Sequence, residues 1–149
     1  MIVILSIDSA PQKGVLSIKL SIKSKKDEVE KFLSNLRKII NSKEFDIDTD
    51  LIIIKTSKEV PEYSTAYALL KLEYNSEDVL QRIRELTVSE YSETLIDKDN
   101  VNSLLLFVFG KEISGRLVYM KLKIKEDDRK SILCLSFHYA KHAMDFPYK

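Results

Sequence analysis

Residues 116–138, RLVYMKLKIKEDDRKSILCLSFH, decide the fold of this chain. Apolar and polar residues alternate through 116–125, and this period of two is typical of a strand with one buried face. A second apolar run covers 131–138, and the charged stretch 126–129 between the two runs indicates a turn. The stretch therefore predicts an antiparallel hairpin.

The two faces of this hairpin are predicted to differ in chemistry. On the first strand, one face carries Val118, Met120, Leu122 and Ile124, and the other carries Tyr119, Lys121, Lys123 and Lys125. On the second strand, the expected apolar set is Leu133, Leu135 and Phe137, opposed by Cys134, Ser136 and His138. Because both strands must bury the same side, the register is expected to place Tyr119 opposite Ser136, with His138 diagonal to Tyr119.

The rest of the chain supplies helices and further strands. A third strand is predicted over 104–109, with Gly110 and Gly115 in turns, and a fourth over 15–23, paired with residues 2–7 through 11–14. Helices are predicted over 25–41, where Ser24 and Asp27 have capping-box spacing, and over 76–86, where Ser76 is the expected cap. Shorter elements are a strand over 51–54, a loop over 56–64, an undecided segment over 67–72 and a capped turn over 87–90.

These elements predict an α+β fold, in which an antiparallel C-terminal sheet packs against N-terminal and middle helices. The chain has 149 residues with 44% hydrophobic residues, 3 Gly and 3 Pro, which favours one globular domain and excludes collagen-like and low-complexity chains. We expect one domain over 1–149, with 1–24 as a strand extension of the body formed by 25–149.

Charge and cysteine content limit the classes of function and the cellular compartments that fit this chain. A net charge of +1 gives no support to strong nonspecific nucleic-acid binding, although residues 110–149 hold nine basic against five acidic residues. The single cysteine excludes an intramolecular disulfide, and the apolar opening 1–5 is too short for a signal-peptide core or a membrane span. We therefore expect a cytoplasmic protein.

The polar face of the hairpin offers chemistry suited to RNA. An imidazole, a phenol, lysines and a hydroxyl on rigid strands are what phosphodiester cleavage without a metal requires. A base activates the ribose 2′-hydroxyl, a cation stabilises the phosphate charge and an acid protonates the leaving oxygen. The same alternation is also the ordinary appearance of any half-exposed strand.

Residues 76–149 resemble the MqsR-type toxins of bacterial toxin–antitoxin systems, ribonucleases with a small RelE-like fold. The resemblance rests on segments in the same order as in that family, and a helix over 25–41 extends it. The segments are the helix 79–86, LTVSEY at 86–91, FGK at 109–111, VYMKL at 118–122, CLSFH at 134–138 and the tail MDFPY at 144–148.

The resemblance implies an mRNA endoribonuclease that leaves a 2′,3′-cyclic phosphate and needs no cofactor or metal. Tyr119 matches the family's catalytic strand tyrosine, and His138 falls where a better-known member has a catalytic lysine. As a histidine, His138 can be either base or acid, and Tyr119 either an acid or a hydrogen-bond donor to the phosphate. The expected catalytic residues are thus His138, Tyr119 and Lys121, and the expected RNA-binding residues are Lys111, Arg116, Lys123, Ser136 and Tyr139.

The resemblance also implies RNA, including mRNA on the ribosome, and a cognate antitoxin as partners, and no membrane. One departure is Glu93, which stands where the better-known member has an active-site lysine, so Lys98, Lys111 or Lys121 would have to supply that charge. The rival function is a catalytically inert protein-binding or regulatory module on the same scaffold, which the near-neutral charge and the missing lysine favour.

Three further features of the sequence carry residue types that can form sites. His138 and His142 have zinc-ligand spacing but lack a partner with matching spacing, so no metal site is expected. Cys134 is expected to be a packed, inert thiol. The acidic run 44–50 lacks the glycine and the closing glutamate of a calcium loop and is expected to be a solvated connection.

Overall fold

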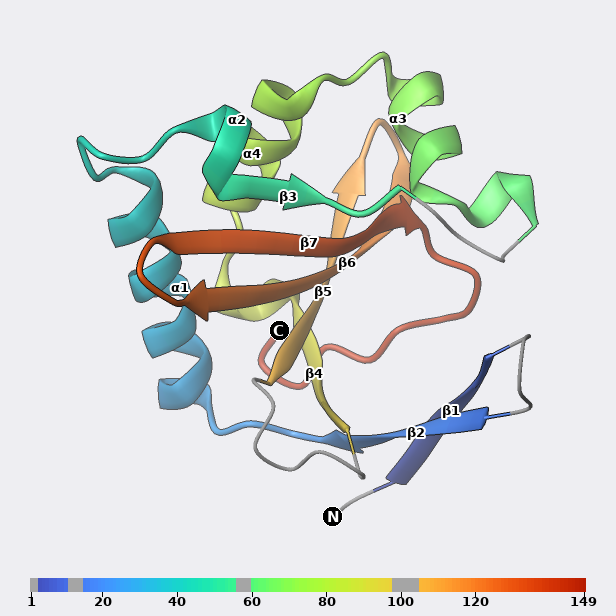
Figure 1. Ribbon diagram of the computed structural model, residues 1–149. Coiled ribbons are helices and arrows are strands. Elements are labelled where there is room, and N and C mark those ends of the chain that lie inside the picture. The colour runs from blue at the N-terminus through green and yellow to red at the C-terminus, as the bar shows by residue number, and fades with distance from the viewer. Residues whose placement is uncertain (1–2, 11–14, 56–59, 98–104) are drawn as a thin grey trace.

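A computed structural model of the chain describes residues 3–10, 15–55, 60–97 and 105–149. Within these ranges, seven strands form one sheet in the order β1-β2-β4-β5-β6-β7-β3 (Figure 1). Outside the described residues lie the predicted turn at 11–14, residues 56–59 of the predicted loop 56–64, and residues 98–104, which include Lys98.

The strands are antiparallel except at one edge. β1 (Val3–Ala10) pairs with β2 (Val15–Ile22), and β2 pairs with β4 (Tyr91–Asp97). β4 is followed in the sheet by β5 (Leu106–Ile113), β6 (Arg116–Glu126) and β7 (Lys130–Tyr139). β3 (Leu51–Ile53) closes the far edge parallel to β7. The predicted α+β class is confirmed, and β1 and β2, which lie within the predicted extension 1–24, join the same sheet as the body.

The helices begin where side chains satisfy their first backbone amides. α1 (Lys26–Ile40) matches the predicted helix, but its capping differs, because the Glu28 carboxylate accepts the Lys25 backbone N–H at 2.7 Å. The predicted Ser24–Asp27 box is wrong, since the Ser24 hydroxyl hydrogen-bonds Thr94 instead. α4 (Ser76–Arg84) is capped by Asn75 rather than by Ser76.

Short helical segments complete the layer above the sheet. The undecided segment forms α3 (Thr65–Leu72), which begins where the Ser64 hydroxyl accepts the Tyr67 N–H at 3.1 Å. The capped turn at 87–90 is confirmed as η2 (Val88–Glu90), and Pro61 opens η1 (Pro61–Tyr63). α2 (Ile47–Asp50) lies inside the acidic run 44–50.

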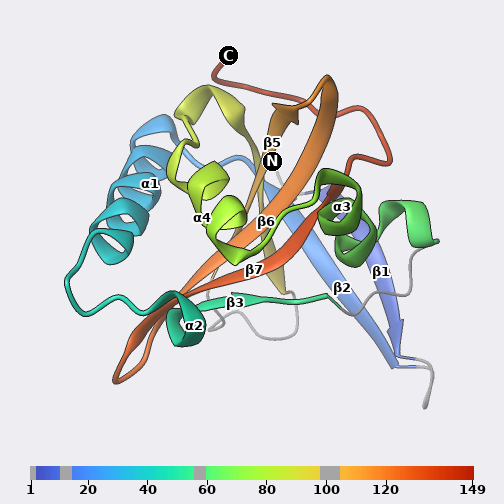
Figure 2. The same cartoon turned by 90° about the horizontal axis from the view of Figure 1, so that it is seen from above.

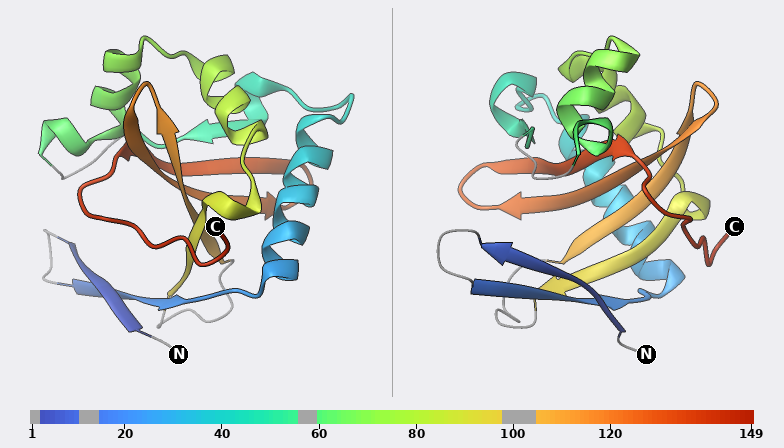
Figure 3. Two further views of the ribbon diagram at one scale, coloured as in Figure 1. Left: turned by 180° about the vertical axis from the view of Figure 1, so that it is seen from behind. Right: turned by 90° about the vertical axis from the view of Figure 1, so that its right-hand side faces the viewer.

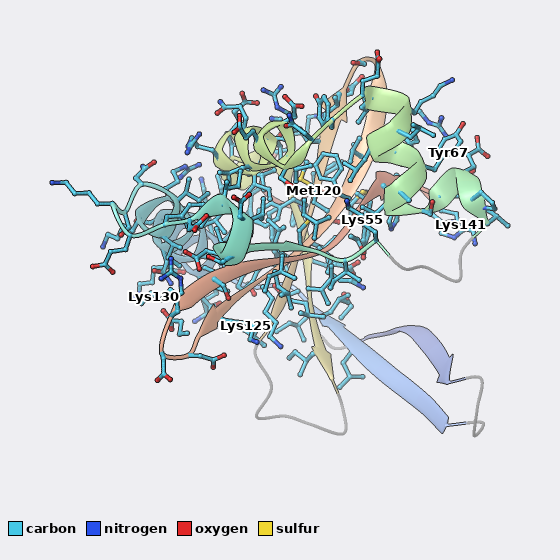
Figure 4. All side chains as sticks on the ribbon, turned by 45° about the horizontal axis from the view of Figure 1, so that its top comes forward. Lys55, Tyr67, Met120, Lys125, Lys130 and Lys141 are labelled. Atoms are coloured by element: carbon cyan, nitrogen blue, oxygen red, sulfur yellow. The ribbon has the colours of Figure 1, made fainter. Side chains whose placement is uncertain are left out.

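The helices cover one face of the sheet, as the view from above shows (Figure 2). Phe32 of α1 stacks on Phe107 of β5 with ring centroids 4.0 Å apart. Figure 4 shows the labelled Met120 in the interior below the helices, whereas Lys125 and Lys130 lie near the turn between β6 and β7. The buried residues of this core come from α1, α3, α4 and β3–β7, including Val29, Leu36, Ile83, Phe109, Met120, Leu122 and Phe137. We call this side of the sheet the helix face and the other side the open face.

Three sequence predictions about the sheet and its surroundings are wrong. Residues 91–97 form the strand β4, which the sequence pattern did not predict. Gly110 lies inside β5 and not in a turn, and the turn comes at Ser114 and Gly115. The acidic run is not simply solvated, because the Asp50 carboxylate is 3% exposed and accepts two bonds from the Arg129 guanidinium at 2.5 and 2.8 Å.

The tail after β7 returns across the open face (Figure 3). A Cβ on Gly110 would lie 2.8 Å from Phe146 Cζ and 2.9 Å from Met144 Sδ, so the tail packs directly on this glycine. At its end, the Tyr148 ring stacks on Tyr91 at 5.8 Å, and its hydroxyl donates to the Ser24 carbonyl. The tail therefore links β7 to the start of α1.

Candidate active site

Tyr119 and His138 lie side by side on the open face. They are direct cross-strand partners in the β6–β7 ladder, and their rings stack with centroids 5.1 Å apart and planes inclined by 11°. The predicted register, with Tyr119 opposite Ser136, is therefore wrong by one pair. The correction brings the two predicted catalytic rings closer than the sequence suggested.

Two features cause the difference. Glu126 pairs with Lys130, so the loop is 127–129 and is one residue shorter than the predicted 126–129, and β7 also contains a bulge. Lys121 pairs with Ser136 but Leu122 pairs with Cys134, so Leu135 is an extra residue. Since an extra residue reverses which side the following side chains face, the predicted apolar set of β7 is split. Ile132, Cys134 and Phe137 are buried on the helix face, whereas Leu133 and Leu135 are only half-buried.

A row of four residues crosses the open face beside the two rings. Glu93 of β4 pairs with Val108 of β5, Val108 pairs with Lys121 of β6, and Lys121 pairs with Ser136 of β7. Lys123 lies one row further from the rings, opposite Leu133. Of the predicted site residues, the structure thus brings together His138, Tyr119, Lys121, Lys123 and Ser136.

Glu93, which the resemblance places where a relative has an active-site lysine, lies on β4, the strand that the sequence pattern did not predict. It is half-buried, and the Ser21 hydroxyl donates to its carboxylate at 2.6 Å. Burial raises the pKa of Glu93 above its usual range, while the bond from Ser21 and the charge of Lys121 oppose this rise and the charge of Asp145 adds to it. No local pattern marks this strand, because Glu93 and Leu95 on one side, and Thr94 and Ile96 on the other, each combine a polar with an apolar residue.

The tautomer of His138 follows from its backbone contact. Its Nδ1 lies 3.0 Å from the Tyr139 carbonyl oxygen, and a carbonyl only accepts hydrogen bonds. Nδ1 therefore carries a hydrogen, and Nε2 is the ring nitrogen that gains or loses a proton.

Three predicted RNA-binding residues lie on the helix face and are not part of this cluster. The Lys111 ammonium pairs with Glu90 at 3.2 Å, because Lys111 is two residues beyond the core residue Phe109 on the same strand. The Arg116 guanidinium lies 3.9 Å from the centroid of the Tyr139 ring, and Tyr139 itself is 4% exposed. Neither Lys111 nor Arg116 can act beside Lys121, and Tyr139 has no open ring face to offer a base.

Cys134 belongs to the packed interior and not to the site. It is fully buried, and burial raises the pKa of its thiol to about 12, so it is inert as predicted. In the described ranges, no group of three His, Cys, Asp or Glu side chains is arranged to hold a metal ion. Among the helices of those same ranges, none has the length and apolar character needed to cross a membrane.

Comparison of the chain with models of protein families, with curated proteins and with solved structures finds no match. The arrangement of its own residues therefore carries the functional argument. That arrangement is an imidazole stacked on a phenol, with a lysine and a half-buried carboxylate in the adjacent row on the same sheet face.

Proposed function

We propose that this chain is an RNA endonuclease related to the MqsR-type toxins with a RelE-like fold. The observation that carries the proposal is the Tyr119–His138 ring pair next to Lys121 on rigid, paired strands. Strands hold side chains in fixed positions, and such preorganisation is what phosphodiester cleavage by side chains alone requires. Lys121, Lys123 and Lys125 follow one another on the same face of β6 and suit the phosphates of an RNA strand.

The chemistry is attack of a ribose 2′-oxygen on the adjacent phosphorus. The P–O5′ bond breaks, and the products are a 2′,3′-cyclic phosphate and a 5′-hydroxyl. Lys121 stabilises the charge on the phosphate oxygens. Nε2 of neutral His138 accepts the proton of the 2′-hydroxyl, the Tyr119 hydroxyl donates a proton to the leaving O5′, and both groups return to their starting states by exchange with water. A cognate antitoxin that neutralises the enzyme and mRNA on the ribosome belong to the same proposal.

The test is cleavage of a defined RNA by the purified protein in EDTA, with the cut ends mapped. We expect discrete cuts with cyclic-phosphate ends, and His138→Ala should lower the single-turnover rate by about 10²–10⁴-fold. Tyr119→Phe, which keeps the ring stack, tests the hydroxyl alone. The matched control is His142→Ala, because His142 is the other histidine of the chain and is exposed in the tail.

A second candidate function is an inert binding module. The tail packed on Gly110, next to Tyr119, and the edge strand β1, which could accept an added strand from a partner, favour it. If neither free RNA nor RNA on ribosomes is cut by any form, the ribonuclease proposal is wrong and the binding module replaces it.

A further inference from the structure

The tail, residues 140–149, covers the surface beside the two rings of the candidate site (Figure 3). Gly110 of β5 is the direct cross-strand partner of Tyr119, and a glycine inside a strand often marks a place where another group approaches the backbone closely. Phe146 and Met144 fill this place, because a Cβ on Gly110 would lie 2.8 and 2.9 Å from them. An RNA strand that passes Tyr119 on this side needs the space that these two side chains occupy.

Met144 also shares an apolar contact surface with Tyr119. Both side chains pack against the buried cluster of the open face, which consists of Leu95, Leu106 and Val108. The tail and the phenol ring therefore meet on one patch of the sheet, and a ligand that lies on this patch must displace the tail.

The backbone hydrogen bonds to the sheet stop where the tail begins. The Ala140 N–H donates to the Leu117 carbonyl at 2.9 Å, next to the end of the β6–β7 ladder. Over 142–148, no backbone hydrogen bond joins the tail to a strand or a helix within the residues that the structure describes. Asp145 also faces Glu93, and its charge helps to raise the pKa of that carboxyl, so this contact is one of like charges. The tail can therefore leave the sheet without breaking the strand ladder.

The end of the tail is held at one residue, Tyr148. Its hydroxyl donates to the Ser24 carbonyl, and its ring stacks on Tyr91 with centroids 5.8 Å apart. The Lys23 ammonium lies 5.8 Å from the centroid of the same ring. We call these three contacts the Tyr148 anchor.

A bulge in β4 separates the Tyr148 anchor from the candidate site. The β4–β5 ladder contains one extra residue, Ser92, between Tyr91 and Glu93. Residues two apart on a regular strand face the same side, but here Tyr91 belongs to the helix-face core and Glu93 lies on the open face. A substitution at Tyr148 therefore weakens the attachment of the tail without changing a residue of the candidate site.

We propose that the tail is an autoinhibitory segment, which keeps RNA away from the Tyr119–His138 pair until the Tyr148 anchor releases it. The inference rests on the proposed ribonuclease function and adds the regulation of the same site. The chain exchanges between a closed form, which the structure shows, and an open form in which the tail has left Gly110. RNA binds the open form, so its apparent affinity is the intrinsic affinity multiplied by the fraction of open chains.

The experiment measures single-turnover cleavage of a defined RNA in EDTA against protein concentration, with full-length variants. Tyr148→Ala removes the anchor and should lower the half-saturating protein concentration about tenfold, because the open fraction rises. The maximal rate should stay unchanged, since every bound RNA lies on an open chain in both proteins. Tyr148→Phe loses only the bond to Ser24 and should have a smaller effect in the same direction. His142→Ala changes an exposed tail residue and should alter neither quantity.

Nuclear magnetic resonance of the methionine methyl groups shows whether the tail opens, and it needs no RNA. In Tyr148→Ala, the Met144 signal should move toward its position in an unfolded chain. The signal of Met120, which is fully buried under the helices, should stay in place. If the Met120 signal also moves, Tyr148→Ala has perturbed the core and Tyr148→Phe carries the test.

The outcomes separate this inference from the function on which it rests. If the Met144 signal moves but the half-saturating concentration does not fall, the inference is wrong and the ribonuclease function stands. If the Met144 signal stays in place, Tyr148 does not hold the tail and the inference is wrong as well. Cleavage by Tyr148→Ala but not by wild type would support both, because the closed form is then inactive. If no form cuts the RNA, free or on ribosomes, both are wrong.

Discussion

The two faces of the sheet differ in what covers them and in what their side chains can do. On the helix face, residues of β5, β6 and β7 such as Phe109, Leu122 and Phe137 are fully buried under α1, α3 and α4. On the open face, the buried apolar cluster is Leu95, Leu106 and Val108, and the tail lies across part of it. Glu93, Lys121, Tyr119 and His138 share that second face and are only partly buried.

Because of this difference, residues that stabilise the fold alternate along one strand with residues whose side chains are available for chemistry. On β6, each residue that anchors the core is followed by one that faces the open side. Because hydrophobic stabilisation scales with the apolar area removed from water, the helix face supplies most of the free energy of folding. The open face can therefore hold charged and titratable groups without a large loss of stability.

The largest expected effect contrasts two neighbours on β6. Leu122→Ala should lower the free energy of unfolding by about 2–5 kcal/mol, because Leu122 is fully buried and the substitution leaves a cavity. Lys123→Ala should change it by no more than about 0.5 kcal/mol and weaken RNA binding, with the slope of log affinity against log salt reduced by about one. Urea denaturation and RNA titrations at several salt concentrations measure both. An equal loss of unfolding free energy in Leu122→Ala and Lys123→Ala would contradict the distinction between the two faces.

A smaller effect contrasts two carboxylates whose pKa values move in opposite directions. The hydrogen bonds from Arg129 hold the pKa of Asp50 below its usual range, so its stabilisation is present above the unfolded pKa and is lost as pH falls through the folded one. Burial raises the pKa of Glu93, so its contribution is present below its unfolded pKa and is lost as pH rises through the folded one.

Asp50→Asn should therefore lower the melting temperature at pH 7 and reduce its decline in acid. Glu93→Gln should not lower the melting temperature at pH 7. Melting curves between pH 3 and pH 8 measure both variants. An Asp50→Asn protein with the same acid dependence as wild type would contradict the role of the Arg129 contact.

The smallest expected effect tests whether the tail packs tightly on the open face. Gly110→Ala places a methyl group against Phe146 and Met144, and should cost about 1 kcal/mol and speed hydrogen exchange of the tail amides. In a Phe146→Ala background the same substitution should cost less, since the obstructing ring is gone. An equal cost in both backgrounds would show that the tail does not press on Gly110.

The hairpin of β6 and β7 was predictable because alternation and turn chemistry are local signals. The helix over 25–41 was predictable for the same reason, since its apolar residues recur at helical spacing. β4 was missed because residues 93–96 alternate between the helix face and the open face, and each face has its own buried cluster. The capped turn before β4 also suggested a helix. The register of β7 was wrong because the charged stretch does not show that Glu126 and Lys130 pair, and because nothing in CLSFH marks Leu135 as the extra residue of a bulge.

By itself, the sequence determined the α+β class, the strand β6 with its two unlike faces, and Tyr119, Lys121 and His138 as candidates. These follow from the periods and residue types of short stretches of chain. Only the tertiary structure decided that Tyr119 faces His138, that Lys111 and Arg116 lie on the helix face, and that Glu93 joins the candidate site. These facts depend on two bulges and on pairing between distant strands, whose registers are set by the packing of the whole sheet against its helices.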